Sequence, residues 1–189
     1  MNNYELAKTT DDVAILKELS NDEDWIVREC VAENPNTDKE TLKELAKDEV
    51  AEVRAAVVKN PNATPEILQK LASDEDWQYR VRCEVARNQN TDLETLQMLA
   101  KDKDSWVRSS VAWNPNTDKE TLQMLAKDEV RAVRKMVAEN PNTDMETLQM
   151  LASDEDLDVR LRVANNPNTG LDTLVDKGYS LDKMDFDNF

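Results

Sequence analysis

The stretch NPNTDKETLQMLAKDEV, residues 114–130, is nearly identical to NPNTDKETLKELAKDEV at residues 34–50, with Gln123 and Met124 in place of Lys43 and Glu44. The same opening recurs every 26 residues, apart from one 28-residue unit over 60–87. Units therefore start near residues 8, 34, 60, 88, 114, 140 and 166, the first being divergent. Repetition at this period predicts a solenoid, because a unit this small buries its apolar face only against its neighbours.

The first half of each unit predicts a short helix with one buried edge. Apolar residues stand at i, i+3 and i+4, as in Leu122, Leu125 and Ala126. A threonine followed three residues later by a glutamate predicts a reciprocal capping box at the start of this helix. The threonines and glutamates of this pattern are Thr37 and Glu40, Thr91 and Glu94, Thr117 and Glu120, and Thr143 and Glu146.

The second half of each unit carries the pattern VRxxVA and predicts a second helix. Two valines four residues apart, such as Val107 and Val111, form its apolar edge. An aspartate lies six residues before each arginine, and we expect it to cap the helix. The unit ends at Asn-Pro, because proline disfavours helical geometry in the residue before it and asparagine tolerates the turn.

The pattern NPNTDxETLxxLAxDxxxxVRxxVA runs through residues 34–165 and resembles the leucine-rich repeat variant family. The resemblance implies an all-α, right-handed α-solenoid of short helix pairs, in which α-helices alternate with 3₁₀-helices and no β-sheet is present. The founding type of that family carries an iron-sulfur cluster held by N-terminal cysteines; this chain has only Cys30 and Cys83, so no cluster is implied. The Asp-to-Arg spacing also resembles HEAT repeats, although 26 residues is short for their helix pairs.

The repeats predict one solenoid domain over residues 1–177, followed by an acidic tail over 178–189. We expect the apolar residues of the tail to cover the last layer of the array at Leu174 and Val163. The alternative is a disordered acidic-hydrophobic motif that docks onto a partner.

Composition limits the function. The formal charge of -16 repels phosphate backbones and anionic membranes, so direct nucleic-acid and membrane binding are not expected. The chain has no histidine and no glycine-rich phosphate loop, which argues against an enzyme and against a cofactor. Its first residues, MNNYELAKTTDD, lack the basic start and apolar run of a secretion signal, so we expect a cytoplasmic protein.

Metal and redox sites are also not expected. The Asp-Glu-Asp triplets at 22–24, 74–76 and 154–156 lack the glycine and downstream glutamate of a calcium loop, and acidic residues favour helix N-termini in any case. Cys30 and Cys83 lie two units apart, about 20 Å if helical layers stack at about 10 Å, which excludes a disulfide. We expect them to pack as small apolar side chains.

The arginine of VRxxVA predicts a structural ladder along the array. Each guanidinium is expected to pair with an aspartate of its own unit or of the adjacent one. The functional alternative is a basic groove for anions. The arginines concerned are Arg28, Arg54, Arg82, Arg108, Arg134 and Arg160.

Positions that vary between units are the candidates for partner binding. A methionine follows glutamine between the two leucines of three successive units, and it either extends the core or forms an adaptable apolar strip. Large aromatic residues in or beside the second helices either wedge between layers or anchor a partner. The two extra residues of the 28-residue unit predict a bulged loop near 77–80. The candidates are Met98, Met124, Met150, Trp77, Tyr79, Trp106 and Trp113.

The favoured function is therefore a non-enzymatic protein-interaction scaffold, monomeric, with a curved acidic surface and an apolar Met/Trp strip. Its acidic side chains would select a basic protein partner. The alternative is an acidic nucleic-acid mimic that inhibits a DNA- or RNA-binding protein. A mimic needs carboxylates in continuous rows, whereas a scaffold needs an apolar strip within an acidic rim.

Overall fold

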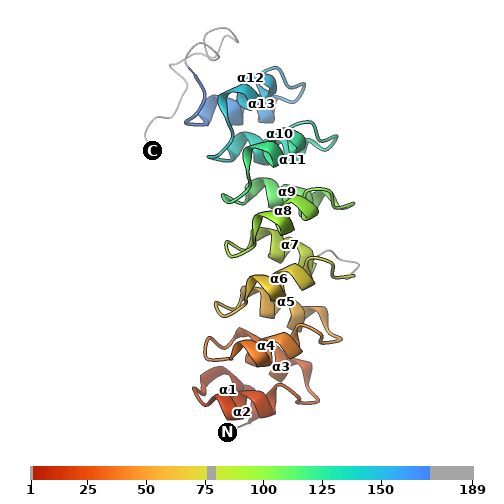
Figure 1. Cartoon of the computed structure of the whole chain (residues 1–189), viewed down its shortest axis with the longest axis vertical. Coiled ribbons are helices and arrows are strands. Elements are labelled where there is room, and N and C mark those ends of the chain that lie inside the picture. The colour runs from red at the N-terminus through yellow and green to blue at the C-terminus, as the bar shows by residue number, and fades with distance from the viewer. Residues whose placement is uncertain (1, 76–79, 171–189) are drawn as a thin grey trace. The chain divides into compact units, whose positions relative to one another are not determined.

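A computed structural model describes residues 2–75 and 80–170, which form α-helices and contain no β-strand (Figure 1). The chain is an all-α solenoid, as the repeat predicts. It divides into two compact units, Met1–Thr95 and Leu96–Phe189. The predicted bulged loop, with Trp77 and Tyr79, and the predicted cap at 178–189 lie outside the described residues.

The helices alternate between the first and second helix of each repeat. In the first unit they are α1 (Asn3–Thr9), α2 (Val13–Leu19), α3 (Trp25–Glu33), α4 (Lys39–Leu45), α5 (Ala51–Lys59), α6 (Pro65–Leu71) and α7 (Arg80–Arg87). Helix α8 (Leu93–Leu99) contains the boundary, and the second unit continues with α9 (Ser105–Trp113), α10 (Lys119–Leu125), α11 (Arg131–Glu139), α12 (Met145–Leu151) and α13 (Leu157–Asn165).

Within each unit the second helices of successive repeats pack against one another. Helix α3 packs on α5 and α5 on α7, while in the second unit α9 packs on α11 and α11 on α13 (Figure 1). The core between the helices consists of the predicted leucines and valines, and Leu122 and Val137 are fully buried. Burial of one such side chain contributes about 1.5–3 kcal/mol, so each repeat is stable only when its neighbour covers it.

Helix α1 was not predicted from the repeat pattern. It packs against α3 as a second helix would, with Ala7 buried. The Nδ2 of Asn34 donates to the Ala7 and Thr10 carbonyls at 2.8 and 3.0 Å, as the corresponding asparagines of later units do to theirs. Since α1 lacks the VRxxVA letters, only this packing identifies it as part of the array.

The expected 3₁₀-helices are wrong for the described part of the chain, where both helices of a repeat are α-helical. In α4 the Ala46 N–H donates to the Leu42 carbonyl at 2.9 Å, the spacing of an α-helix. The i to i−3 spacing appears only after the helix, where the Lys47 N–H donates to the Glu44 carbonyl at 2.9 Å. Seven residues suffice for α-type hydrogen bonds when an aspartate caps the N-terminus.

The predicted capping box is also wrong. The N-cap of α4 is Asp38, whose Oδ1 accepts from the Thr41 N–H at 2.7 Å. Thr37 is fully buried, and its hydroxyl instead donates to the Val31 carbonyl at 2.5 Å. The threonine thus satisfies a carbonyl near the end of the preceding helix, which leaves capping to the aspartate that follows it.

Candidate functional site

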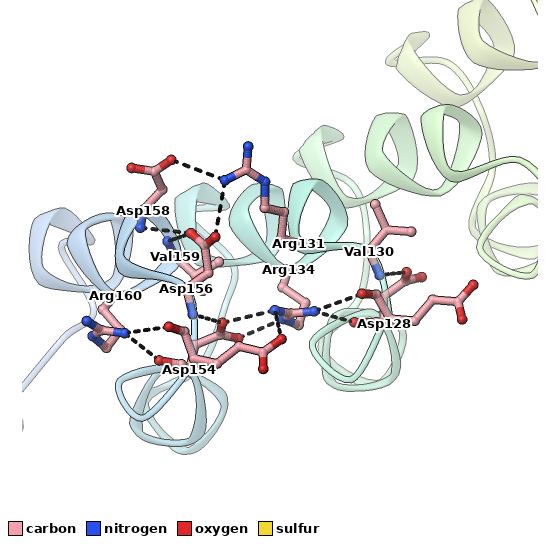
Figure 2. Close-up of polar contacts among 11 residues, drawn as sticks. Asp128, Val130, Arg131, Arg134, Asp154, Asp156, Asp158, Val159 and Arg160 are labelled. Carbon is pink, nitrogen blue, oxygen red and sulfur yellow. Dashed lines mark hydrogen bonds and ion pairs between the residues drawn. The ribbon is translucent and has the colours of Figure 1, made fainter.

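The arginine ladder joins each repeat to the next. Arg134 of α11 donates from Nε and Nη2 to both carboxylate oxygens of Asp154, at 2.7 and 3.0 Å, in the next repeat (Figure 2). Its Nη1 donates to the Asp128 and Glu129 carbonyls of its own repeat at 2.9 and 3.2 Å. One side chain therefore fixes the loop of its own repeat and the aspartate of the following one.

The same arrangement recurs within both units. The bidentate pairs are Arg28 with Asp48, Arg54 with Asp74, Arg108 with Asp128 and Arg134 with Asp154. Arg82 and Arg160 make the carbonyl part of the contact, to Asp74 and Asp154, at 2.8 and 2.7 Å. Of the two partners that the sequence allowed, the carboxylate is the one in the adjacent repeat.

The ladder aspartates do not cap the second helices, contrary to the expectation. Asp128 lies three residues before α11, and its Oδ1 accepts from the Val130 N–H at 2.8 Å in the turn that leads into the helix (Figure 2). Where a side chain caps a second helix it comes from a later residue, such as Asp104 or Asp156. The aspartate that forms the ion pair lies six residues before the arginine in the 26-residue repeats and eight residues before Arg82 in the longer one.

The ion pairs are shielded from solvent. The Arg108 and Asp128 side chains are 13% and 8% exposed. Burial alone would raise the pKa of the Asp128 carboxyl, but hydrogen bonds from Arg108 and the Val130 N–H lower it overall, and the same balance lowers the pKa of Asp48 and Asp154. Because the guanidinium groups are engaged on both sides, they form an inter-repeat connection rather than an open groove for anions.

These pKa shifts predict a loss of stability in acid. The folded chain lowers the pKa of Asp48, Asp128 and Asp154, so the stability from their ion pairs is present above the ordinary aspartate pKa of about 4 and is lost as the pH falls through the lower folded-state value. We expect the thermal midpoint, followed by circular dichroism, to decrease steeply below about pH 4. Asp128→Asn should decrease less, whereas an equal decrease in both proteins would contradict the assignment.

The asparagine at the start of each unit holds neighbouring turns together. Asn140 is 2% exposed, and its Nδ2 donates to the Ala112 and Asn114 carbonyls at 2.7 and 3.0 Å. Its Oδ1 accepts from the Asn142 N–H at 2.8 Å. Both the amide nitrogen and the amide oxygen of Asn140 are therefore engaged in structural hydrogen bonds.

The three methionines line up on the first helices of the second unit. Met98, Met124 and Met150, on α8, α10 and α12, are 44%, 40% and 41% exposed. Beside Met98 and Met124, Gln97 and Gln123 donate to the N-cap aspartates of the following repeats, Asp118 at 2.9 Å and Asp144 at 3.3 Å. We call Met98, Met124 and Met150 the methionine row.

Met124→Glu is expected to change the free energy of unfolding by no more than about 0.5 kcal/mol, because the side chain is largely in solvent and the same repeat position is Glu44 in the first unit. Urea unfolding followed by circular dichroism measures this difference. A much larger loss of stability would assign Met124 to the core.

The tryptophan candidates lie on other helices than the methionine row. Trp106 and Trp113 are on α9, a second helix, and are 59% and 51% exposed. The methionines and tryptophans therefore do not form the single strip that the sequence predicted but lie as two sets on two rows of helices. Sequence spacing identified both sets without revealing that separation.

A groove that was not predicted lies along two Asn-Pro turns of the second unit. It has a volume of about 870 Å³ and is lined by Pro115, Asp118, Glu120, Pro141 and Met145, among others. Met145 is exposed and stands where other units carry lysine, leucine or proline at the first helical position. The variation of residue type at this position was the available sequence signal.

Metal-ligand clusters, cysteines and long apolar helices were also considered in the described part of the chain. No group of three or more carboxylate or thiol side chains there is placed to hold a metal ion. Cys30 and Cys83 are buried and not joined in a disulfide, and burial raises the pKa of the Cys30 thiol. No described helix is long and apolar enough to cross a membrane.

Comparisons with known proteins agree with the repeat geometry. The model of the leucine-rich repeat variant domain matches residues 29–80, and that of the leucine-rich repeat variant matches residues 131–156. A solved structure described as a leucine-rich repeat variant with a novel repetitive protein structural motif is 31% identical, with a TM-score of 0.68, and the match covers 86% of this chain. The chain spans 64% of the length of that structure.

Two engineered proteins are more distant. One has a TM-score of 0.42 and 17% identity over 94% of this chain and 66% of its own, and the other a TM-score of 0.35 and 17% identity over 94% and 89%. Among curated proteins no sequence match was found.

Proposed function

Because the chain belongs to the leucine-rich repeat variant family, we propose that it is a non-enzymatic scaffold that binds another protein. Proteins built from such repeats typically act as scaffolds, since stacked helices offer extended faces rather than closed pockets. The observation that carries the proposal is the methionine row. Its setting is the cytoplasm, where reduced thiols such as the buried Cys30 and Cys83 persist.

The methionine row suits protein contact for two reasons. Unbranched, polarisable side chains adapt to different apolar partners. The equivalent positions of the first unit are the charged Glu44 and Lys70, so stability of the repeat does not require methionine there. A row of exposed apolar side chains that the fold does not need marks a candidate contact surface.

The chemistry beside the row indicates a basic partner. Glu120 precedes Met124 by four residues, and Glu146 precedes Met150 by four, so each glutamate shares a helix face with its methionine. Both glutamates are exposed. An apolar row edged by carboxylates complements a segment with alternating apolar and basic side chains, and the formal charge of -16 would accelerate the encounter. An apolar row beside the exposed Glu120 and Glu146 is the pattern expected of a scaffold, and on that ground we favour it over a nucleic-acid mimic.

Affinity capture with matched variants tests the proposal. The Met98→Gln, Met124→Gln and Met150→Gln triple variant removes the apolar row without changing the charge. The control is the Glu44→Gln and Lys70→Gln double variant, which alters equivalent positions of the first unit at constant charge. We expect the triple variant to lose a protein that wild type and control retain. Equal capture by all three, with unchanged circular dichroism, would refute the proposal.

A further inference from the structure

Helix α9 displays two large aromatic side chains on one face. Trp106 and Trp113 are separated by seven residues, two helical turns, which places them on the same side of the helix about 10 Å apart along its axis. Both are more than half exposed. The backbone of Trp106 is fixed, because its N–H donates to Asp104 Oδ1 at 2.8 Å and its carbonyl accepts from the Ser110 hydroxyl at 2.9 Å.

The surroundings of the two indoles are unusual for so acidic a chain. Helix α9 contains no aspartate or glutamate, and its arginine, Arg108, is engaged by Asp128. In the part of the chain that the structure describes, the cation–π contact is that of Lys8, whose Nζ lies 4.3 Å from the Tyr4 ring centroid. The faces of the α9 indoles are therefore left available to a cation from outside.

Nearby cations are already compensated. On α11, which packs against α9, Arg131 pairs with Asp156 at 3.2 Å, and Arg162 of α13 pairs with Glu139 at 2.9 Å. Lys135 of α11 would repel a basic ligand, but its side chain is half-buried. The formal charge of -16 of the whole chain outweighs this single positive charge.

We propose that Trp106 and Trp113 bind lysine or arginine side chains of an extended basic segment by cation–π contacts. Indole is the strongest aromatic acceptor for such cations. In a polyproline II conformation, residues three apart lie on one side at about 9 Å, close to the separation of the indoles. The inference rests on the proposed function. It adds a second contact surface, on the second helices, that binds positively charged side chains directly.

The test uses the full chain labelled with ¹⁵N and two synthetic peptides. One carries lysines three residues apart in a serine and proline background, and the other has norleucine in place of each lysine. We expect the lysine peptide to shift the indole N–H signals of Trp106 and Trp113 but not that of Trp25, and the norleucine peptide to bind about tenfold more weakly. Equal affinity of the two peptides would overturn the proposal, since it would reduce the contact to apolar packing.

A variant separates this inference from the proposed function. Trp106→Leu combined with Trp113→Leu keeps apolar side chains at exposed positions, and Trp25→Leu is the matched control in the first unit. We expect the double variant to bind the lysine peptide about tenfold more weakly and the control to bind normally. If the double variant retains both the peptide and the captured protein while the methionine variant loses that protein, this inference fails and the scaffold stands. If the methionine variant retains the captured protein and the double tryptophan variant loses it, the assignment of the methionine row as the partner surface fails.

Discussion

Arg108→Ala is expected to lower the free energy of unfolding by about 3 kcal/mol or more, because it leaves the shielded carboxylate of Asp128 without its guanidinium. The substitution also frees the Asp102 and Lys103 carbonyls, which accept from Arg108 Nη1 at 2.9 and 3.2 Å. Urea unfolding followed by circular dichroism measures the loss. Lysine at this position should restore only part of it, since an ammonium group does not reproduce the bidentate fork.

The control for Arg108 is Arg131, in the next second helix. Arg131 is 68% exposed and its pair with Asp156 is open to solvent, so Arg131→Ala should cost about 0.5 kcal/mol. If the two alanine variants unfolded at the same urea concentration, the arginine ladder would not couple the repeats.

Asn140→Ala is expected to destabilise the second unit by about 3 kcal/mol, since it removes three hydrogen bonds and leaves buried backbone groups unsatisfied. Those groups are the carbonyls of Ala112 and Asn114 and the N–H of Asn142. The thermal midpoint and urea unfolding give the change. Retention of most wild-type stability would mean that water replaces the asparagine amide.

Asn142, two residues later in the same turn, provides the comparison. Its side chain is exposed and donates to the Pro115 carbonyl, so Asn142→Ala should cost about 1 kcal/mol or less. A reversed order of the two asparagine variants would contradict the roles assigned to them.

The recurring residues of the repeat predicted most of the fold because each has a single structural role. The two leucines and two valines marked the core, and the spacing of aspartate and arginine, which is the same in all the 26-residue repeats, marked the ion pair. Whether the arginine reaches its own aspartate or the next one depends on how repeats stack, which spacing within a single repeat does not encode. The structure supplies that information.

The errors have a physical origin in competition for hydrogen bonds. Thr37 and Asp38 are both good N-cap residues, and the sequence pattern favoured the threonine. The threonine is committed to the Val31 carbonyl, so Asp38 caps α4. Helix α1 was missed because its role depends on packing against α3 rather than on repeat letters.

The candidate site was only partly predictable. The change from Glu44 to Met124 at one repeat position indicated variation that the fold tolerates, but it left open whether the methionine was buried. The exposure of the methionine row depends on how the helices pack, which the sequence pattern does not show. The placement of Met124 and Trp106 on different rows of helices also depends on helix packing and could not be predicted from the sequence pattern.

The most direct test of the scaffold is site-specific photocrosslinking in the cells that express the chain. A photoactivatable amino acid is placed at Met124 and, in a second protein, at Glu44, the equivalent position of the first unit. The account predicts a covalent adduct with another protein from position 124 that the Met98→Gln and Met150→Gln substitutions weaken, and no such adduct from position 44. Identical adducts from both positions, or none from position 124, would contradict a partner surface at the methionine row.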